Sequence, residues 1–280
     1  MNRQMELPFK TLSSRENVTY KHIKSLRQAK KAHEAGLVLV EGFRQVEEAL
    51  AAGIQPLWLI VSQAALTHER WSALLTLAQA RCEAKPFECL LLEPRLFEGL
   101  SATASPQGVA LVAPSPILAS PAAQPDATGL YLVLEGIQDP GNLGTMIRTA
   151  DAFAFSGVIL AGPTTDPFGD KALRSAMGST FHLPVYQFPS IVEVKHWLSA
   201  SKIPLIAAEL SGETLSRSTV LAPPAALVIG NEGAGLSSEA LALSDRHLKI
   251  AMPGQAESLN AAAAAAILCH LFALGRPEAQ

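Results

Sequence analysis

Several features of this chain of 280 residues are scarce, and each scarcity excludes a class of protein. Its three cysteines, Cys82, Cys89 and Cys269, form no CxxC pair and no zinc-ligand spacing with histidine, and an odd number of scattered cysteines is typical of a reducing cytosol. The most apolar stretch, residues 261–274, is too short to span a bilayer and contains His270. The N-terminus lacks the apolar core of a signal peptide. We therefore expect a soluble cytoplasmic protein that binds no metal and associates with no membrane.

The sequence also lacks the common phosphate-binding loops. No GxxxxGK[ST] segment is present, so hydrolysis of nucleoside triphosphates has no support. A Rossmann-type enzyme requires a GxGxxG turn after its first strand and an acidic residue about twenty positions later. After the apolar run at residues 130–134 the chain continues with EGIQDP at residues 135–140, which does not match that turn. A nucleotide-dependent enzyme of this type is therefore a disfavoured alternative.

Charge is sparse and unevenly distributed. Charged residues make up 17% of the chain, hydrophobic residues 49%, and the formal net charge is −3, so the chain can build a sizeable core. Between Lys10 and Lys31, however, there are seven lysine and arginine residues and a single acid, Glu16. Local patches bind phosphates regardless of the net charge, so this stretch predicts either a nucleic-acid partner or a solvated helix face.

Residues 13–113 alternate between helix-forming and strand-forming segments, which predicts an α/β sandwich. Gly36 and Gly53 are suited to end two of the helices. The predicted helices cover residues 18–35, 43–52 and 69–80. The predicted strands cover residues 37–40, 57–61 and 108–112.

A proline-rich stretch at residues 114–128 predicts an extended linker between a domain at residues 1–113 and a second at residues 129–280. The strands of the second domain show no polar alternation, which indicates a mostly parallel sheet covered on both faces. They are predicted over residues 130–134, 157–161, 184–187, 205–209, 225–229 and 248–251. Helices are predicted over residues 143–155, 171–178, 191–200 and 259–274.

Polar loops occupy residues 139–148, 229–236 and 250–260 of the second domain, each after an apolar strand. Parallel strands end at the same edge of a sheet, and open α/β folds bind their ligands at that edge. The sequence therefore predicts that the three loops share one site.

Each loop contains residues suited to chemistry, and each also has an ordinary structural explanation. In the first, Asn142 offers a donor and an acceptor, and Arg148 suits a phosphate or a developing oxyanion; a capped helix with a surface arginine explains both equally well. The glycine-rich second loop, with Glu232, suits either a nucleotide-like ligand or a plain tight turn. In the third, Ser258 and Asn260 precede a helix that either residue could cap.

In order and residue identity, the three loops together resemble the motifs of the SpoU/TrmH family of SPOUT RNA methyltransferases. Residues 166–179 are similar to the family's segment between the first and second motifs. The first domain is similar to the substrate-binding domain of many members. The similarity is carried by residues 13–17, 41–44 and 106–109 and by the lysine-rich segment at residues 18–35. The resemblance implies an α/β SPOUT fold with a mostly parallel sheet and a C-terminal deep trefoil knot, plus a smaller ribosomal-protein-like α/β domain at the N-terminus.

The same resemblance implies an enzyme that transfers a methyl group from S-adenosylmethionine to a ribose 2′-hydroxyl in structured RNA, with ribosomal RNA favoured. It also implies a homodimer with its site near the subunit interface. The expected catalytic residues are Arg148, Asn142, Glu232, Ser258 and Asn260. The expected cofactor-binding residues are Leu210, Gly230, Ile250, Met252 and Leu259. The expected RNA-binding residues are Arg15, Lys21, Lys24, Arg27, Lys30, Lys31 and Arg44.

Two points stay open on the sequence alone. The motif match makes Arg148 the principal catalytic residue, either as a general base or as a group that holds a phosphate and stabilises an alkoxide. A guanidinium stays protonated in proteins, so the second role is physically easier. The alternatives for the whole chain are a methyltransferase that acts on transfer RNA and a non-catalytic RNA-binding protein.

Overall fold

The computed structural model describes residues 8–116, 118–216, 219 and 221–276. The chain forms two compact units, which are described one at a time. Unit 1 comprises Met1–Ile117 and Phe168–Phe181, and unit 2 comprises Leu118–Pro167 and His182–Gln280. None of the helices in the described ranges combines the length and the apolarity that crossing a bilayer needs.

Unit 1 is built on a mixed five-stranded sheet with the order β1-β4-β3-β5-β2. β1, β4 and β3 run parallel to one another, and β5 pairs antiparallel with both β3 and β2. Val40 and Leu39 in β2 point into apolar clusters on opposite faces, so both faces of the sheet are covered. The strands are β1 (Phe9–Leu12), β2 (Leu37–Glu41), β3 (Trp58–Ser62), β4 (Glu88–Leu92) and β5 (Val109–Pro114).

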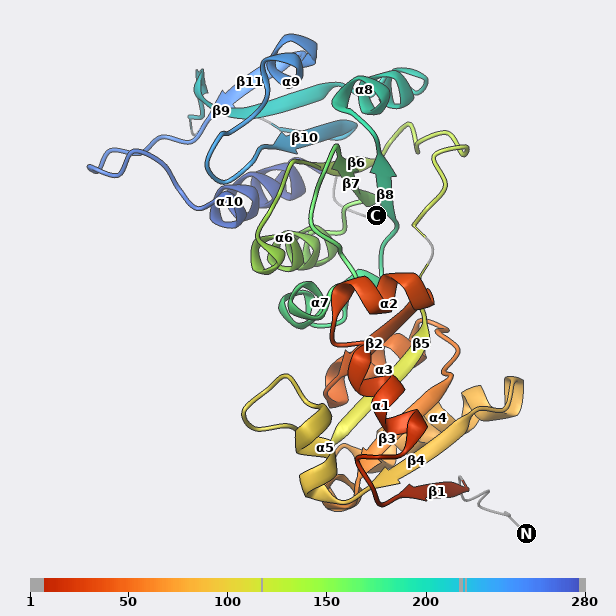
Figure 1. Cartoon of the computed structure of the whole chain (residues 1–280). Coiled ribbons are helices and arrows are strands. Elements are labelled where there is room, and N and C mark those ends of the chain that lie inside the picture. The colour runs from red at the N-terminus through yellow and green to blue at the C-terminus, as the bar shows by residue number, and fades with distance from the viewer. Residues whose placement is uncertain (1–7, 117, 217–218, 220, 277–280) are drawn as a thin grey trace. The chain divides into compact units, whose positions relative to one another are not determined.

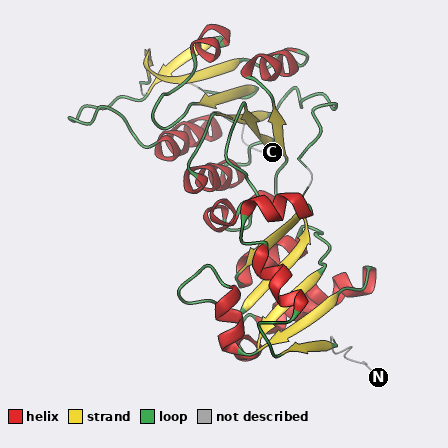
Figure 2. Ribbon diagram, viewed as in Figure 1, coloured by secondary structure: helices red, strands yellow, loops and turns green. Residues whose placement is uncertain are grey.

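The helices of unit 1 surround this sheet (Figures 1 and 2). They are α1 (Val18–Ser25), α2 (Ala29–Ala35), α3 (Phe43–Ala51), α4 (Trp71–Ala84), α5 (Pro94–Leu100) and α7 (Asp170–Ala176), with 3-10 turns η1 (Gln63–Thr67) and η2 (Ser179–Phe181). The single helix predicted over residues 18–35 is wrong, because the chain breaks into α1 and α2. Gln28 has an extended backbone, and the Arg27 guanidinium donates to the Leu100 carbonyl at 2.8 Å. Tertiary contacts therefore override the local helix propensity here.

Residues 168–181 belong to unit 1 because their apolar side chains are buried there. Leu173 is 2% exposed and lies in the same core cluster as Val38, with Phe168 and Phe181 packed against it. Gly178 has φ +100°, and a Cβ built on it would lie 2.5 Å from Cγ of Glu48. The compact units thus depart at this segment from the predicted domain boundaries of 1–113, 114–128 and 129–280.

Unit 2 contains a six-stranded sheet with the order β11-β9-β10-β6-β7-β8, in which every pairing is parallel. This confirms the mostly parallel sheet that the uninterrupted apolar runs predicted. The strands are β6 (Leu130–Glu135), β7 (Gly157–Ala161), β8 (Val185–Phe188), β9 (Leu205–Thr214), β10 (Ala225–Ile229) and β11 (Arg246–Lys249).

Helices α6 and α10 lie side by side in unit 2, as Figure 1 shows. α6 begins three residues earlier than predicted, because Pro140 occupies its first turn and the Asp139 carboxylate caps it by accepting from the Asn142 amide at 2.9 Å. The helices of this unit are α6 (Pro140–Ala152), α8 (Ile191–Ser199), α9 (Ser238–Leu243) and α10 (Ala261–Leu274). Three polar loops follow β6, β10 and β11 at the carboxyl edge of the sheet.

Candidate active site

Glu232, in the loop after β10, is bound to the loop after β6. Its carboxylate accepts hydrogen bonds from the backbone N–H groups of Gln138 and Asp139, both at 3.2 Å. It also accepts from Nδ2 of Asn142 at 3.0 Å. One carboxylate therefore fixes the course of the first loop and the orientation of its asparagine.

Asn260 connects the third loop to the same group. Its Oδ1 caps α10 by accepting from the amides of Ala262 and Ala263 at 2.9 and 3.2 Å. Its Nδ2 donates to Oδ1 of Asn142 at 3.1 Å. The side chains of Glu232, Asn142 and Asn260 thus form one hydrogen-bonded chain, which we call the loop bridge, and it joins all three predicted loops.

The hydrogen bonds of the loop bridge keep Glu232 ionised. Partial burial raises the pKa of this carboxyl, but the bonds from Asn142, from its own amide and from the amides of Gln138 and Asp139 outweigh that effect and hold the pKa below its ordinary value. A carboxylate with a depressed pKa and several donors around it is a weak base. Its geometry suits positioning rather than proton abstraction.

The second loop closes on itself in a tight turn. The Asn231 and Gly235 backbones exchange hydrogen bonds at 3.0 and 2.9 Å, and Oδ1 of Asn231 accepts from the amides of Gly233 and Ala234, both at 2.9 Å. A Cβ at Gly230 would lie 2.3 Å from the carbonyl carbon of Gly235, so only glycine fits there. Sequence reasoning missed Asn231, although an asparagine two residues after a strand in a glycine-rich turn is a recognisable turn residue.

A cavity of about 500 Å³ opens beside these loops. Its wall combines β9, the tight turn, the third loop and α10, and it includes the glycines of the second loop and several aliphatic side chains. The five predicted cofactor-binding residues all line it, namely Leu210, Gly230, Ile250, Met252 and Leu259. Glu232 and Ser258 line it as well, so the cavity adjoins the loop bridge.

Of the predicted catalytic residues, Glu232 and Ser258 line this cavity, whereas Asn142, Asn260 and Arg148 do not, and Arg148 alone of the five also lies outside the loop bridge and the cavity wall. It lies on α6 six residues after Asn142, which corresponds to a rise of about 9 Å and a rotation of about 240° around the helix. Its side chain is exposed, it is absent from the cavity wall, and no hydrogen bond or ion pair of its guanidinium occurs within the described ranges. That Arg148 shares a site with Asn142 stays a prediction.

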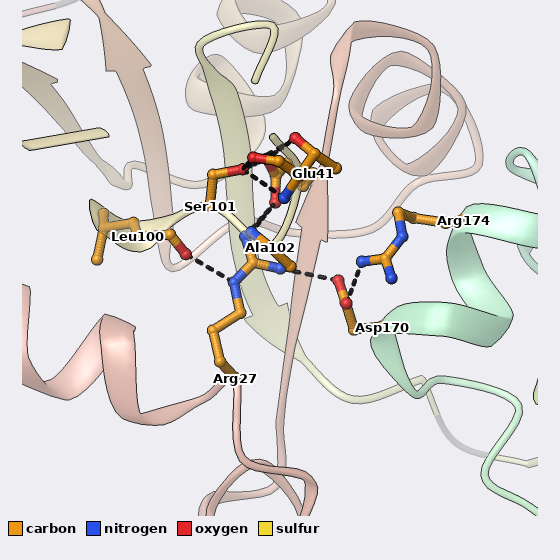
Figure 3. A network of polar contacts seen from close by, with 8 residues as sticks. Arg27, Glu41, Leu100, Ser101, Ala102, Asp170 and Arg174 are labelled. Atoms are coloured by element: carbon orange, nitrogen blue, oxygen red, sulfur yellow. Dashed lines mark hydrogen bonds and ion pairs between the residues drawn. The ribbon is translucent and has the colours of Figure 1, made fainter. Parts of the chain in front are cut away.

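The predicted RNA-binding residues lie in unit 1 and differ in their surroundings. Arg27 is half-buried and bonded to Glu41 and Asp170 (Figure 3). Arg44 lies 4.0 Å from Glu48 across one helical turn and is exposed. The others are exposed side chains on or near α1 and α2, namely Arg15, Lys21, Lys24, Lys30 and Lys31.

The described residues contain no group of three or more His, Cys, Asp or Glu side chains that could hold a metal ion. The three cysteines are free thiols. Burial raises the pKa of Cys89 and of Cys269 to about 12, so these two are neutral at physiological pH.

Comparison with known proteins defines the class to which this fold and these loops belong. Residues 129–270 match the SpoU rRNA Methylase family, and residues 17–111 match the MRM3-like substrate binding domain. The chain therefore belongs to the SpoU rRNA methylase family.

Individual relatives cover nearly the whole chain. The 23S rRNA (guanosine(2553)-2′-O)-methyltransferase RlmP of Bacillus subtilis is 34% identical over 93% of this chain and 98% of its own length. A 23S rRNA (uridine(2479)-2′-O)-methyltransferase of Streptomyces viridochromogenes is 42% identical over 46% of this chain and 47% of its own. The AdoMet-bound rRNA methyltransferase of Sinorhizobium meliloti superposes with a TM-score of 0.81 at 30% identity, covering 93% of this chain and 96% of that one. The fold is thus the SPOUT fold expected from the motifs, while its trefoil knot stays a prediction.

Proposed function

We propose that this chain transfers a methyl group from S-adenosylmethionine to a ribose 2′-hydroxyl of ribosomal RNA. The observation that carries the proposal is the loop bridge beside the cavity of about 500 Å³, both built from the segments that mark the family. The relative from Bacillus subtilis and that from Streptomyces viridochromogenes are both named as 2′-O-methyltransferases of 23S ribosomal RNA. Ribosomal RNA is therefore favoured over transfer RNA.

The residues of the cavity fit S-adenosylmethionine. A volume of about 500 Å³ is of the size usual for small-molecule sites. The tight turn after β10 brings backbone groups to the wall where Gly230 leaves no side chain, and Leu210, Met252 and Leu259 supply apolar surface for an adenosine and a thioether chain. When bound, the cofactor supplies a methyl group that its positively charged sulfur activates. Solved relatives from Sinorhizobium meliloti and Streptomyces viridochromogenes are named as bound to AdoMet.

The side chains of the loop bridge would position the substrate. Glu232 accepts from three groups of the first loop, so it orients Asn142 and does not serve as the base. Asn142 and Asn260 are hydrogen-bonded to each other, and Asn142 to Glu232 of the cavity wall, so both amides would be close enough to the cavity to hold the ribose. Ser258 lines the cavity and offers a hydroxyl to the ribose or to the cofactor's carboxylate.

Arg148 would act on a neighbouring subunit. It lies on the exposed face of α6, and α10 beside it exposes Ile267 at 40% and Leu274 at 67%. Apolar side chains on adjoining exposed helices are typical of an interface between copies. We propose a homodimer in which the guanidinium from one protomer reaches the cavity of the other, holds a phosphate of the RNA and stabilises the developing alkoxide.

The cellular compartment in which the protein acts can be inferred from its substrate. An enzyme of ribosomal RNA acts where that RNA is made and assembled, and three free thiols suit a reducing compartment. We propose that the protein is cytoplasmic.

Calorimetry with S-adenosylmethionine tests the proposed cofactor on the wild-type protein and on Asn260→Ala. The substitution removes the cap of α10 and the bond to Asn142, so we expect binding near one molecule per protomer in the wild type and weaker binding in the variant. Ser190→Ala is the matched control, because Ser190 likewise caps a helix, α8, but lies outside the three loops and the cavity wall. Absence of binding by the folded wild type would refute the proposal.

A further inference from the structure

The wall of the cavity beside the three loops contains a carboxylate, Glu209, that takes no part in the loop bridge. It lies on β9 and lines the cavity of about 500 Å³ together with Ser211 from the same strand. Its side chain is 17% exposed. Glu232 is the other acidic residue of the described wall, which contains no lysine or arginine. Glu209 is thus a largely buried acid that lines the cavity and that the loop bridge does not use.

A β-bulge brings Glu209 to the cavity. β9 and β11 pair in register as far as Ala207 and His247, and the next residue of β11 pairs with Glu213. Residues 208–212 of β9 therefore bulge out between these two pairs. A Cβ on Gly212 would lie 2.7 Å from the carbonyl carbon of His247, so the bulge closes against β11 at a glycine. Bulges beside active sites commonly redirect side chains, and all but the last residue of this bulge line the cavity.

Two contacts hold the Glu209 carboxylate and use part of its accepting capacity. Its Oε1 contacts Nδ1 of His247, and because a carboxylate has only acceptors, Nδ1 carries the proton in this contact. Its Oε2 accepts from the Ser211 hydroxyl at 3.0 Å. Each oxygen of a carboxylate can accept about two hydrogen bonds, so both keep accepting capacity after these contacts. The carboxylate therefore offers a pair of neighbouring acceptors to a ligand.

A pair of acceptors on one carboxylate matches the two hydroxyls of a ribose. A vicinal diol presents two O–H donors side by side, and in dinucleotide sites an acidic side chain holds a ribose hydroxyl. The amino-acid part of S-adenosylmethionine carries a carboxylate that Glu209 would repel, and no basic side chain of the described wall offsets that repulsion. The chemistry of Glu209 therefore suits the ribose better than the amino-acid part.

We propose that Glu209 binds the ribose hydroxyls of S-adenosylmethionine and that His247 is a positioning residue, which orients the carboxylate from the neighbouring strand. This inference rests on the proposed function for the identity of the cofactor. Ser211 holds the second carboxylate oxygen, so the acid is anchored from both sides. The ribose would thereby be fixed between the bulge of β9 and the rest of the cavity wall.

The test is the binding of S-adenosylhomocysteine and of its 2′-deoxy and 3′-deoxy analogues, measured by calorimetry on the whole protein. In the wild type, removal of a hydroxyl that donates to a carboxylate is expected to weaken binding about ten-fold. In Glu209→Ala the parent compound should bind about ten-fold more weakly than in the wild type, and the deoxy analogues no worse than the parent. Glu209→Gln keeps the volume of the side chain and should reduce the same hydroxyl effect.

His247→Ala and His247→Asn test the positioning role. Without the imidazole the carboxylate keeps its charge but loses one of its two anchors, so the parent compound should bind several-fold more weakly in His247→Ala. The amide of His247→Asn can donate from about the place of Nδ1 and should restore binding. Glu213→Ala is the control, because Glu213 lies on the same strand, pairs with the exposed Arg246 at 3.1 Å and does not line the cavity.

Two results would overturn the proposal. A hydroxyl effect that persists unchanged in Glu209→Ala would show that this carboxylate does not meet the ribose. The desamino analogue of S-adenosylhomocysteine gives the second result. If Glu209→Ala abolishes the effect of removing the amino group and not that of removing a hydroxyl, the carboxylate holds the ammonium group instead.

The same measurements separate this inference from the function on which it rests. Absence of S-adenosylhomocysteine binding by the folded wild type refutes the proposed cofactor. Binding by the wild type with an equal hydroxyl effect in Glu209→Ala refutes the ribose contact alone. Hydroxyl-dependent binding that requires Glu209, without any methyl transfer to ribosomal RNA, refutes the proposed function and retains the contact.

Discussion

At the scale of single residues, Glu232 determines how the three loops fit together. Its carboxylate meets two backbone N–H groups and one amide NH₂, and all three groups are donors. A carboxylate is the one ionised side chain that accepts at every position around its two oxygens. The residue therefore supports the loop bridge by its charge and its shape together.

Replacing Glu232 by glutamine tests that role. Glu232→Gln keeps the volume but turns one acceptor into an NH₂ group that faces other donors, which costs about 1 to 3 kcal/mol for each donor left without a partner. We expect methyl transfer to fall about ten-fold or more in single-turnover assays. Glu239→Gln, at an exposed position in the first turn of α9, serves as the control and is expected to leave the rate unchanged.

The pKa of Glu232 adds a prediction about pH. Because the folded pKa lies below the ordinary value of 4.5, this carboxylate stabilises the fold above that pH and stops doing so as the pH falls through its folded pKa. The Tm of the wild type should exceed that of Glu232→Gln at pH 7, and the difference should shrink below about pH 4.5. A difference in Tm that grows as the solution becomes more acidic would contradict a lowered pKa for Glu232.

At the scale of elements, the turn after β10 depends on a close approach between backbones. Gly230→Ala places a Cβ 2.3 Å from the Gly235 carbonyl carbon, so the turn must move and the cavity wall with it. We expect affinity for S-adenosylmethionine, measured by calorimetry, to fall at least about ten-fold. In Gly233→Ala, in the same turn, the atom nearest to the new Cβ is Oδ1 of Asn231 at 3.6 Å. This variant should therefore bind S-adenosylmethionine as tightly as the wild type. Equal affinities in the two variants would show that the turn does not shape the site.

The packing of α7 against the rest of unit 1 depends on Arg27. Arg27→Ala leaves the buried Glu41 carboxylate without its cation, which costs about 3 to 5 kcal/mol and should lower Tm by roughly 10 °C. Lys30→Ala, on the exposed face of α2, should lie within about 0.5 kcal/mol of the wild type. A variant Arg27→Ala as stable as the control would mean that the network in Figure 3 contributes nothing to the fold.

Some elements are predictable from the sequence because local pattern and final environment agree. β7 and β10 occupy the residues that their apolar runs predicted, and Gly36 ends α2 in a left-handed conformation at φ +62°. β4, with the sequence ECLLL, was not predicted because it contains no β-branched residue and forms through pairing with β1 and β3. The break at Arg27 and the burial of Leu173 in unit 1 depend on contacts far apart in the sequence, which periodicity does not record.

The candidate site, too, is only partly predictable from the sequence. The order of the three loops and the parallel sheet placed Asn142, Glu232 and Asn260 at one edge, and the structure brings them within hydrogen-bond distance. Arg148 could not be located in this way, because its position relative to the cavity depends on helix phase. The order of strands and loops thus predicts which loops meet, but it does not predict where a side chain on the following helix points.

At the scale of the whole molecule, the chain passes between its two units three times, after residues 117, 167 and 181. The proline-rich segment is therefore one of three covalent connections, and the other two flank α7.

Mixed dimers test whether Arg148 serves the neighbouring subunit. Arg148→Ala and Gly230→Ala are each expected to be inactive alone. If the arginine acts across the interface, each mixed dimer contains one intact cavity served by one intact arginine, so an equal mixture should recover about a quarter of wild-type activity. If it acts within its own chain, the mixture should recover none. Arg276→Ala, which removes a surface arginine that donates to the Ala154 carbonyl, is the control and should be active by itself.

The central claim is that this chain methylates the 2′-hydroxyl of ribosomal RNA. The most direct measurement is the transfer of a labelled methyl group from S-adenosylmethionine to 23S ribosomal RNA, followed by alkaline hydrolysis of the product. A methylated 2′-hydroxyl cannot attack the adjacent phosphate, so the account predicts label at one alkali-resistant linkage, with the signal lost in Asn260→Ala. Label that appears only in mononucleotides would place the methyl on a base, and no transfer by the folded protein would contradict the account altogether.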